Sequence, residues 1–127
     1  MASVYKFTHA ADFQARIAIR NMFLGTTYRS DELLIPWCTY TEPEVAHVGK
    51  YEMELTKTDY EVYVRPLAGV DRCLCDNVTA GFVKLLVAKD GGKILGATIV
   101  GPQAGDMIAE VTLCIQYNIS ITQLAGM

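Results

Sequence analysis

Residues 81–116 read GFVKLLVAKDGGKILGATIVGPQAGDMIAEVTLCIQ, and this stretch decides the fold class. Two runs rich in β-branched and apolar residues flank Lys89-Asp90-Gly91-Gly92, whose residues tolerate positive φ, and this pattern predicts a β-hairpin. Both runs are almost continuously apolar, which indicates a sheet covered on both faces, or on one face plus a partner. The glycine-proline corner that follows, Gly101-Pro102, leads into a sequence with helical periodicity.

The residues after Pro102 predict an amphipathic helix. Their apolar side chains recur at i, i+3, i+4 and i+7, which is the spacing of one helix face. Asn118 is suited to end this helix, and Ser120 or Thr122 is suited to begin another short one. The pattern leaves open which side chains face the sheet and which face a partner. The stripe consists of Ala104, Met107, Ile108, Val111, Cys114 and Ile115.

A second helix is predicted near the N-terminus, over Thr8–Phe23. The Thr8 side chain can cap the first turn, and Gly25 follows the last turn. Apolar residues surround more than one face of this helix. Small alanines on its second face predict close packing against another element.

Three segments between this helix and the hairpin carry weaker patterns. Residues 33–40 have the composition of a strand, and Pro36 places that strand at an edge or beside a bulge. Residues 41–49 predict one or two helical turns, because Pro43 suits the first position of a helix. Residues 57–69 alternate with the period of a half-buried strand. This order of elements predicts an α+β fold with a largely antiparallel sheet flanked by helices.

The composition limits the classes of function. The chain has 127 residues, half of them apolar, and a net charge of −3, so it predicts a single soluble domain that buries about two-thirds of its surface. The acidic balance argues against nucleic acid and against an anionic membrane as partners. Tyr60, Tyr63 and Arg65 are therefore assigned to packing or subunit contact rather than base stacking. No apolar run approaches the ~20 residues of a membrane span, and the first residues lack a signal peptide, so we expect a cytoplasmic location.

The candidates for chemistry within the chain are few. Cys73 and Cys75 form a C-x-C that could bind a soft metal, but a closed zinc site needs further ligands, so free thiols are favoured. His47 has no serine or cysteine partner in a recognisable context, and a structural or solvent-facing histidine is favoured. The glycines of residues 101–105 lack the lysine of a phosphate loop. We therefore assign no catalytic residue and no metal site.

Three stretches together resemble a known family. They are FTHAADFQARIAIRN (7–21), IPWCTYTEPEVAHVG (35–49) and GFVKLLVAKDGGKILGATIVGPQAGDMIAE (81–110). Their order and spacing resemble the C-terminal dimerisation domain of the pyridine-nucleotide–disulfide oxidoreductases, the flavoenzyme family of glutathione reductase, dihydrolipoamide dehydrogenase and mercuric reductase. The similarity is greatest to mercuric-reductase-like members. It implies that residues 1–30 resemble the end of an FAD-binding domain and that residues 31–127 form a C-terminally truncated dimerisation domain.

The resemblance also implies where the chemistry of a parent enzyme would lie. In this family, upstream domains that bind FAD and NAD(P)H carry the electrons, and the interface domain pairs two subunits. Thr8, His9 and Ala10 match the start of the helix whose N-terminus points at the flavin, where main-chain N–H groups stabilise negative charge. The chain itself contains no G-x-G-x-x-G and no C-x-x-x-x-C, and it ends before the family's histidine segment. We therefore expect no bound cofactor and no activity from this chain alone.

These implications define the expected function. The chain is expected to be the dimerisation piece of a flavin-dependent oxidoreductase, with upstream FAD and NAD(P) domains and a second copy of itself as partners. The subunit contact is expected on the sheet and on the helix after Pro102, with Met107, Ile108 and Val111 as anchors. The alternative is a free-standing module whose whole task is homo- or heterodimerisation.

Overall fold

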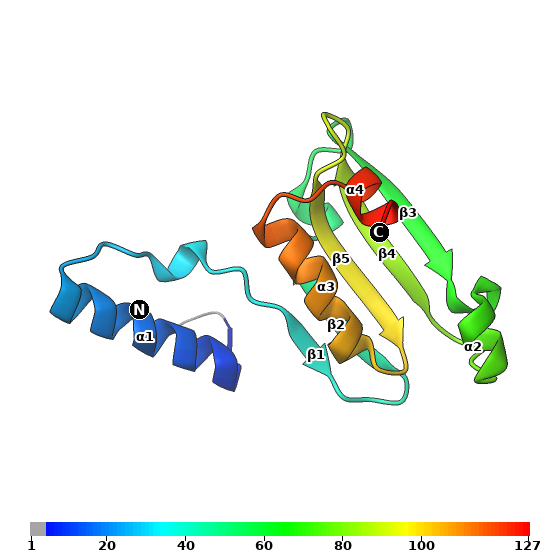
Figure 1. Ribbon diagram of the computed structural model, residues 1–127, viewed down its shortest axis with the longest axis horizontal. Helices are drawn as coiled ribbons and strands as arrows, with labels where there is room; N and C mark the ends of the chain where they lie inside the picture. The colour runs from blue at the N-terminus through cyan, green and yellow to red at the C-terminus, as the bar shows by residue number, and fades with distance from the viewer. Residues whose placement is uncertain (1–4) are drawn as a thin grey trace. The chain divides into compact units, whose positions relative to one another are not determined.

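The computed structural model describes residues 5–127. The chain divides into two compact units, with the boundary between Ile35 and Pro36. The first unit contains helix α1 (Thr8–Leu24) and the short 3-10 helix η1 (Ser30–Glu32), and the second contains all the strands. Figure 1 labels the helices and strands along the chain.

The predicted N-terminal helix is confirmed as α1, but its cap is not. Thr8 is the first helical residue, and Phe7 takes the N-cap position without a side-chain cap hydrogen bond. Gly25 adopts a φ of 64°, the left-handed conformation that commonly ends a helix. Within α1 only Ala10 is buried.

The loop after α1 is tied to the helix by one side chain. The Asn21 amide donates to the carbonyl of Tyr28 at 2.8 Å. Its oxygen accepts from the Thr26 hydroxyl at 2.8 Å and from the Tyr28 N–H at 3.0 Å. The Arg20 guanidinium lies 4.6 Å from the centroid of the Tyr28 ring, which is a cation–π contact. These contacts hold the loop against the end of the helix.

The second unit is built on a five-stranded sheet in the order β1-β2-β5-β4-β3. Every neighbouring pair is antiparallel, which confirms the predicted α+β class with an antiparallel sheet. The predicted hairpin is confirmed as β4 and β5, and Gly91 and Gly92 in its turn both have positive φ. The strands are β1 (Trp37–Thr39), β2 (Glu44–Gly49), β3 (Tyr60–Pro66), β4 (Phe82–Ala88) and β5 (Ile94–Gly101).

The helical turns predicted over residues 41–49 are wrong, because Glu44–Gly49 is strand β2 in the interior of the sheet. The register places Ala46 opposite Ile99 and Val48 opposite Ala97. All four of these side chains are buried. Long-range burial and pairing with β5 therefore override the local signal for a helix start.

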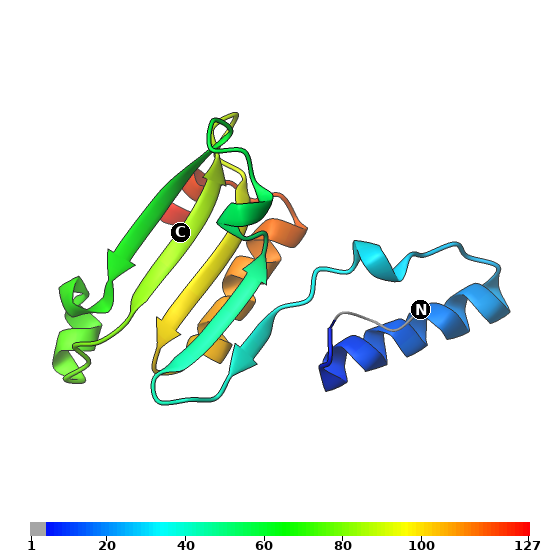
Figure 2. The same ribbon diagram turned by 180° about the vertical axis from the view of Figure 1, so that it is seen from behind.

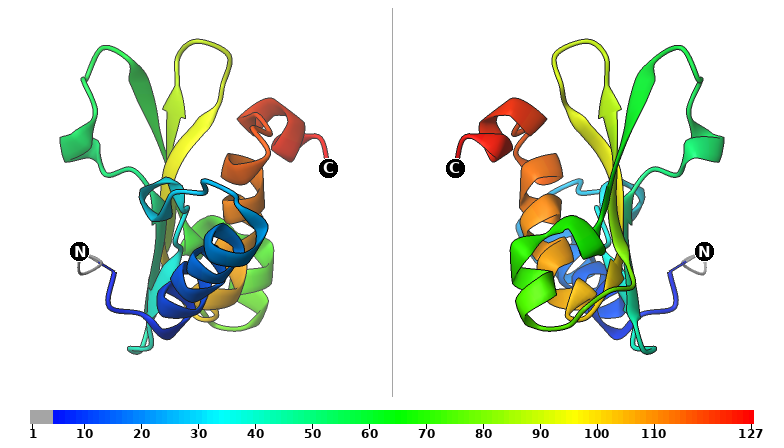
Figure 3. Two further views of the ribbon diagram at one scale, coloured as in Figure 1. Left: turned by 90° about the vertical axis from the view of Figure 1, so that its left-hand side faces the viewer. Right: turned by 90° about the vertical axis from the view of Figure 1, so that its right-hand side faces the viewer.

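One face of the sheet is covered by helix α3 (Ala104–Gln116), which crosses β2 and β5. Figures 1 and 3 show α3 and the short helix α4 (Ile121–Ala125) on this face. Ser120 caps α4, as predicted, by accepting from the N–H of Gln123 at 3.2 Å. The core lies between α3 and the sheet. It includes Ala46, Val48, Ala97, Ile99, Ala104, Ile108, Val111 and Cys114.

The opposite face of the sheet is crossed by a short segment, residues 50–55, which contains the 3-10 helix η2 (Glu52–Glu54) and which we call the strap (Figure 2). The strap approaches the sheet at Gly96. A Cβ at Gly96 would lie only 2.1 Å from the carbonyl oxygen of Lys50, so this position requires glycine.

The link from β3 to β4 contains the 3-10 helix η3 (Leu67–Gly69) and helix α2 (Asp71–Cys75). The strand predicted over residues 57–69 is confirmed as β3, but it is not half-buried. It lies at the edge of the sheet, and only its first residue, Tyr60, is buried. Helix α3 packs mainly on β2 and β5, so the side chains of this edge strand have little cover on the face of the sheet, which explains the difference.

Candidate subunit interface

Helix α3 presents an inner and an outer face. Ile108 and Val111 are buried against the sheet, so the structure assigns both side chains to the core of this chain. Met107 lies at the flank of the helix and is 36% exposed. Of the three predicted anchors, Met107 is thus the one whose side chain is open to a partner.

The outer face of α3 carries a second set of large side chains, which we call the outer row: Glu110, Leu113 and Tyr117. Leu113 and Tyr117 are one turn apart and both are exposed. A helix that already buries its inner face and still exposes large apolar side chains indicates an interaction surface. The sequence analysis misses this row because it follows one apolar stripe, although the i, i+4 spacing of Leu113 and Tyr117 is visible in the sequence.

The N-terminus of α3 already holds a carboxylate. The Gly105 N–H donates to Glu44 Oε2 at 3.0 Å, across the contact between β2 and the helix. The Cys38 Sγ lies 3.8 Å from the same oxygen. Burial, together with the Glu44 charge, raises the pKa of the Cys38 thiol, so this cysteine is an unreactive neighbour. Gly105 therefore binds a protein carboxylate rather than a phosphate, and Gly101 leaves room for the Leu67 side chain.

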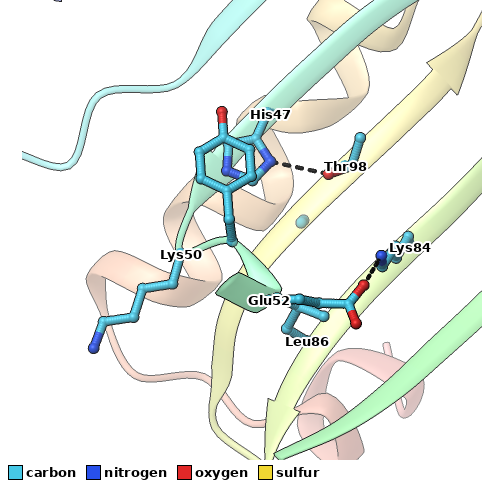
Figure 4. Close-up of a pocket in the computed structure, with 8 residues that line it drawn as sticks. His47, Lys50, Glu52, Lys84, Leu86 and Thr98 are labelled. Atoms are coloured by element: carbon cyan, nitrogen blue, oxygen red, sulfur yellow. Dashed lines mark hydrogen bonds and ion pairs between the residues drawn. The ribbon is translucent and has the colours of Figure 1, made fainter. Parts of the chain in front are cut away.

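His47 lies on the face of the sheet opposite α3, where the strap covers it. Its ring stacks on the Tyr51 ring, with 3.8 Å between centroids and 3° between planes. Its Nδ1 is 2.9 Å from the Thr98 hydroxyl (Figure 4), and its Nε2 is 3.2 Å from the carbonyl oxygen of Gly49. A carbonyl only accepts, so Nε2 donates and Nδ1 accepts from Thr98.

The surroundings of His47 favour a structural role. Burial lowers its pKa, against smaller opposing effects of the Gly49 carbonyl and the Glu54 charge. The adjacent cavity encloses about 40 Å³, and no serine or cysteine is among the residues that line it. Lys84 and Glu52 form an ion pair beside it (Figure 4). The ring is thus buried and hydrogen-bonded through both nitrogens, in a strand rather than in the expected helical turn.

The residues that the family resemblance assigns to a cofactor lie in the first turn of α1. Thr8 begins the helix, and the rings of Phe7 and His9 stack with 5.5 Å between centroids. Ala10 is fully buried. The first turn contains no acidic side chain and has no side-chain cap. This arrangement suits an electron-rich group at the helix end.

The cysteine pair lies in helix α2, where Cys73 is partly buried and Cys75 is exposed. Within residues 5–127, His, Cys, Asp and Glu side chains do not gather in any group of three that could hold a metal ion. In the same part of the chain, none of the helices has the length and apolar character needed to cross a bilayer.

Comparisons with known proteins identify what this arrangement resembles. Residues 35–127 match the family model described as pyridine nucleotide-disulphide oxidoreductase, dimerisation domain. The dihydrolipoyl dehydrogenase of Mycoplasma pneumoniae is 38% identical over 93% of this chain, and that of Geobacillus stearothermophilus is 35% identical over 92%. The mercuric reductase of Bacillus cereus is 32% identical over 94%. The crystal structure of LpdA from Mycobacterium tuberculosis matches 99% of this chain with a TM-score of 0.85 at 24% identity, which supports the fold.

The relatives are much longer than this chain. The matched region is 26% of the Mycoplasma protein, 25% of the Geobacillus protein, 19% of the Bacillus mercuric reductase and 28% of the LpdA chain. The family model nevertheless covers all five strands and both α3 and α4. The chain therefore belongs to the dimerisation domain family of the pyridine nucleotide-disulphide oxidoreductases.

Proposed function

We propose that this chain is the dimerisation part of an FAD-dependent, NAD(P)H-linked disulfide oxidoreductase and that it catalyses no reaction by itself. The observation that carries this proposal is the family match over residues 35–127, combined with the exposed Leu113 and Tyr117 on the outer face of α3. A flavoprotein parent, with FAD and NAD(P)H on domains outside this chain, is consistent with relatives about four times its length.

The parent enzyme is better described as dihydrolipoyl-dehydrogenase-like than as mercuric-reductase-like. The two bacterial dihydrolipoyl dehydrogenases are 38% and 35% identical to this chain, and the mercuric reductase is 32% identical.

The first unit supports an origin in a larger flavin-binding domain. Phe13, Met22 and Phe23 on α1 are all exposed. Several large apolar side chains exposed on one helix indicate a surface that another part of a larger domain covers. A cleft of about 620 Å³ between α1 and the following loop has the apolar Phe13 and Leu33 and the basic Arg20 in its lining. We propose that the FAD and NAD(P) domains of the parent cover these surfaces.

The first turn of α1 fits the proposed flavin contact. It has neither an acidic side chain nor a side-chain cap that would compete with an electron-rich ring. When bound, FAD would supply the electron transfer. Thr8, His9 and Ala10 would supply main-chain dipoles that stabilise negative charge on the reduced ring.

The proposed subunit contact is the outer face of α3, with Met107 at its flank and the outer row at its centre. Replacing Leu113 with glutamate places a charge in a two-fold contact, and we expect self-association through this face to be lost, which sedimentation velocity reads as weaker association than that of the wild type. Leu74→Glu on α2 is a matched control, because Leu74 and Leu113 are both 57% exposed. A Leu113→Glu chain that remains as strongly associated as the Leu74→Glu chain would contradict this contact.

The native mass of the product separates the fragment from the free-standing module. An antibody against this domain should detect a polypeptide several times larger than 14.0 kDa in the source cells. Purification of that species should give bound flavin and NAD(P)H-linked disulfide reductase activity. A native product of about the size of this chain, colourless and inactive, would instead establish the dimerisation module as the whole protein.

A further inference from the structure

We propose that β3 is a second self-association surface, through which two copies of this chain pair edge to edge as antiparallel strands. This surface is separate from the outer face of α3. Strand β3 ends the sheet on one side, and within residues 36–127 no other strand pairs with its outer edge (Figures 1 and 2). Its Val62 and Val64 side chains are 43% and 56% exposed. An exposed apolar edge strand is a template for pairing with another strand.

The main-chain groups that face outward can be assigned from the hydrogen bonds at the two ends of β3. The Leu67 N–H donates to Gly81, and the Asp59 carbonyl accepts from Lys89. Because bonding alternates along an antiparallel pair, the odd-numbered residues of β3 bond to β4. The N–H and C=O groups of Val62 and Val64 consequently point away from the sheet. Pro66, which has no N–H, falls in the same outward set, where a strand tolerates proline.

The sequence of β3 is complementary to itself. In a two-fold antiparallel pair centred on Tyr63, Val62 lies opposite Val64 of the second copy and can exchange both main-chain hydrogen bonds with it. Glu61 lies opposite Arg65 of the second copy, and the same pair repeats on the other side of the axis. Opposite charges at directly facing positions stabilise a strand pair, and like charges destabilise it. The strand YEVYVRP thus meets a second copy with matched charges and matched apolar side chains.

The charged side chains are already held along this edge. The Tyr63 hydroxyl donates to Glu61 Oε2 at 2.7 Å, and this bond is the main cause that raises the pKa of Tyr63. The Arg65 guanidinium donates to the carbonyl of Gly69. Each charged group retains further capacity, because a carboxylate has a second oxygen and a guanidinium has five N–H donors. The strand therefore presents its charges for pairing without a change of backbone.

The test uses charge reversal in the whole chain, read by sedimentation velocity over a range of concentrations. In the proposed pair, position 61 of each copy faces position 65 of the other. Glu61→Arg therefore places arginine opposite arginine at both of these positions, and Arg65→Glu places glutamate opposite glutamate. We expect each single variant to weaken edge association about tenfold or more. A one-to-one mixture of the two variants restores opposite charges at both positions, and so does the double variant E61R/R65E. Both should associate as strongly as the wild type.

The mixture is the decisive measurement, because a folding defect in either variant cannot be cured by mixing. Both positions are exposed, and circular dichroism should show unchanged secondary structure. Repeating the series with Leu113→Glu in every chain separates the two surfaces. In the Leu113→Glu background, association through β3 should persist and should still depend on the charges at positions 61 and 65, even if the contact through α3 is lost. Single variants that associate like the wild type, or a mixture that fails to recover, would overturn the proposal.

Discussion

His47 is hydrogen-bonded at both ring nitrogens and stacked on one ring face, so the stability of the fold should depend on its protonation state. Burial lowers its pKa from the ordinary value of 6.5. As the pH falls below 6.5, the unfolded chain therefore binds a proton before the folded chain does. The free energy of unfolding should decrease from there until the pH passes the pKa of the folded state, by at most about 1.4 kcal/mol per pH unit. Urea denaturation at a series of pH values measures this slope.

The variant His47→Phe isolates this contribution from that of other titrating groups. Phenylalanine keeps a ring against Tyr51 but gives up the bonds to Thr98 and Gly49. The variant should have a lower free energy of unfolding than the wild type at about pH 7.5. The difference between the two free energies should become smaller toward about pH 5, because only the wild type loses stability when the His47 imidazole of its unfolded chain binds a proton. Curves for the two proteins that fall in parallel would show that His47 does not carry the effect.

The inner and outer faces of helix α3 should contribute differently to stability. Ile108 is buried against the sheet and Leu113 is exposed on the outer side. Ile108→Ala leaves a cavity under the helix and should reduce the free energy of unfolding by about 2–5 kcal/mol. Leu113→Ala should change it by about 0.5 kcal/mol or less at low protein concentration, where subunit contacts do not contribute. Similar losses at the two positions would mean that α3 is not seated on the sheet by its inner face.

The elements that local sequence predicts are those whose signals come from neighbouring residues. The hairpin depends on two glycines in its turn and α3 on one apolar periodicity, and both are confirmed. The local pattern of residues 41–49 indicates helical turns, but Glu44–Gly49 forms strand β2. Its pairing and burial depend on β5, some fifty residues further along the chain, and a local pattern does not contain that information. Edge position likewise decides the exposure of β3, and no local pattern encodes it.

The candidate interface could be predicted only in part, for the same reason. The sequence placed an interface on α3, but a single stripe cannot tell a side chain that meets the sheet from one that meets solvent. The Glu44 carboxylate at the start of α3 and the Tyr51 ring over His47 were both missed. The first contact joins residues 61 positions apart in the chain. The second depends on the turn at Gly49, which has a positive φ and ends a segment that the sequence analysis assigned to helix.

At the scale of the whole molecule, the two units contribute unequally to stability. Of the buried apolar side chains, Ala10 and Ile35 alone belong to the described part of the first unit. Because burial of apolar surface is the main stabilising term, residues 36–127 should fold by themselves and unfold within about 1 kcal/mol of the whole chain. Residues 1–35 alone should be largely unfolded, since a helix of about 17 residues is marginal without tertiary contacts. Urea denaturation of residues 36–127, and circular dichroism of residues 1–35, check the two halves of this expectation. A large decrease in the free energy of unfolding on removal of the first unit would contradict this expectation. It would mean that the first unit stabilises the sheet directly, rather than packing only against other domains of a longer enzyme.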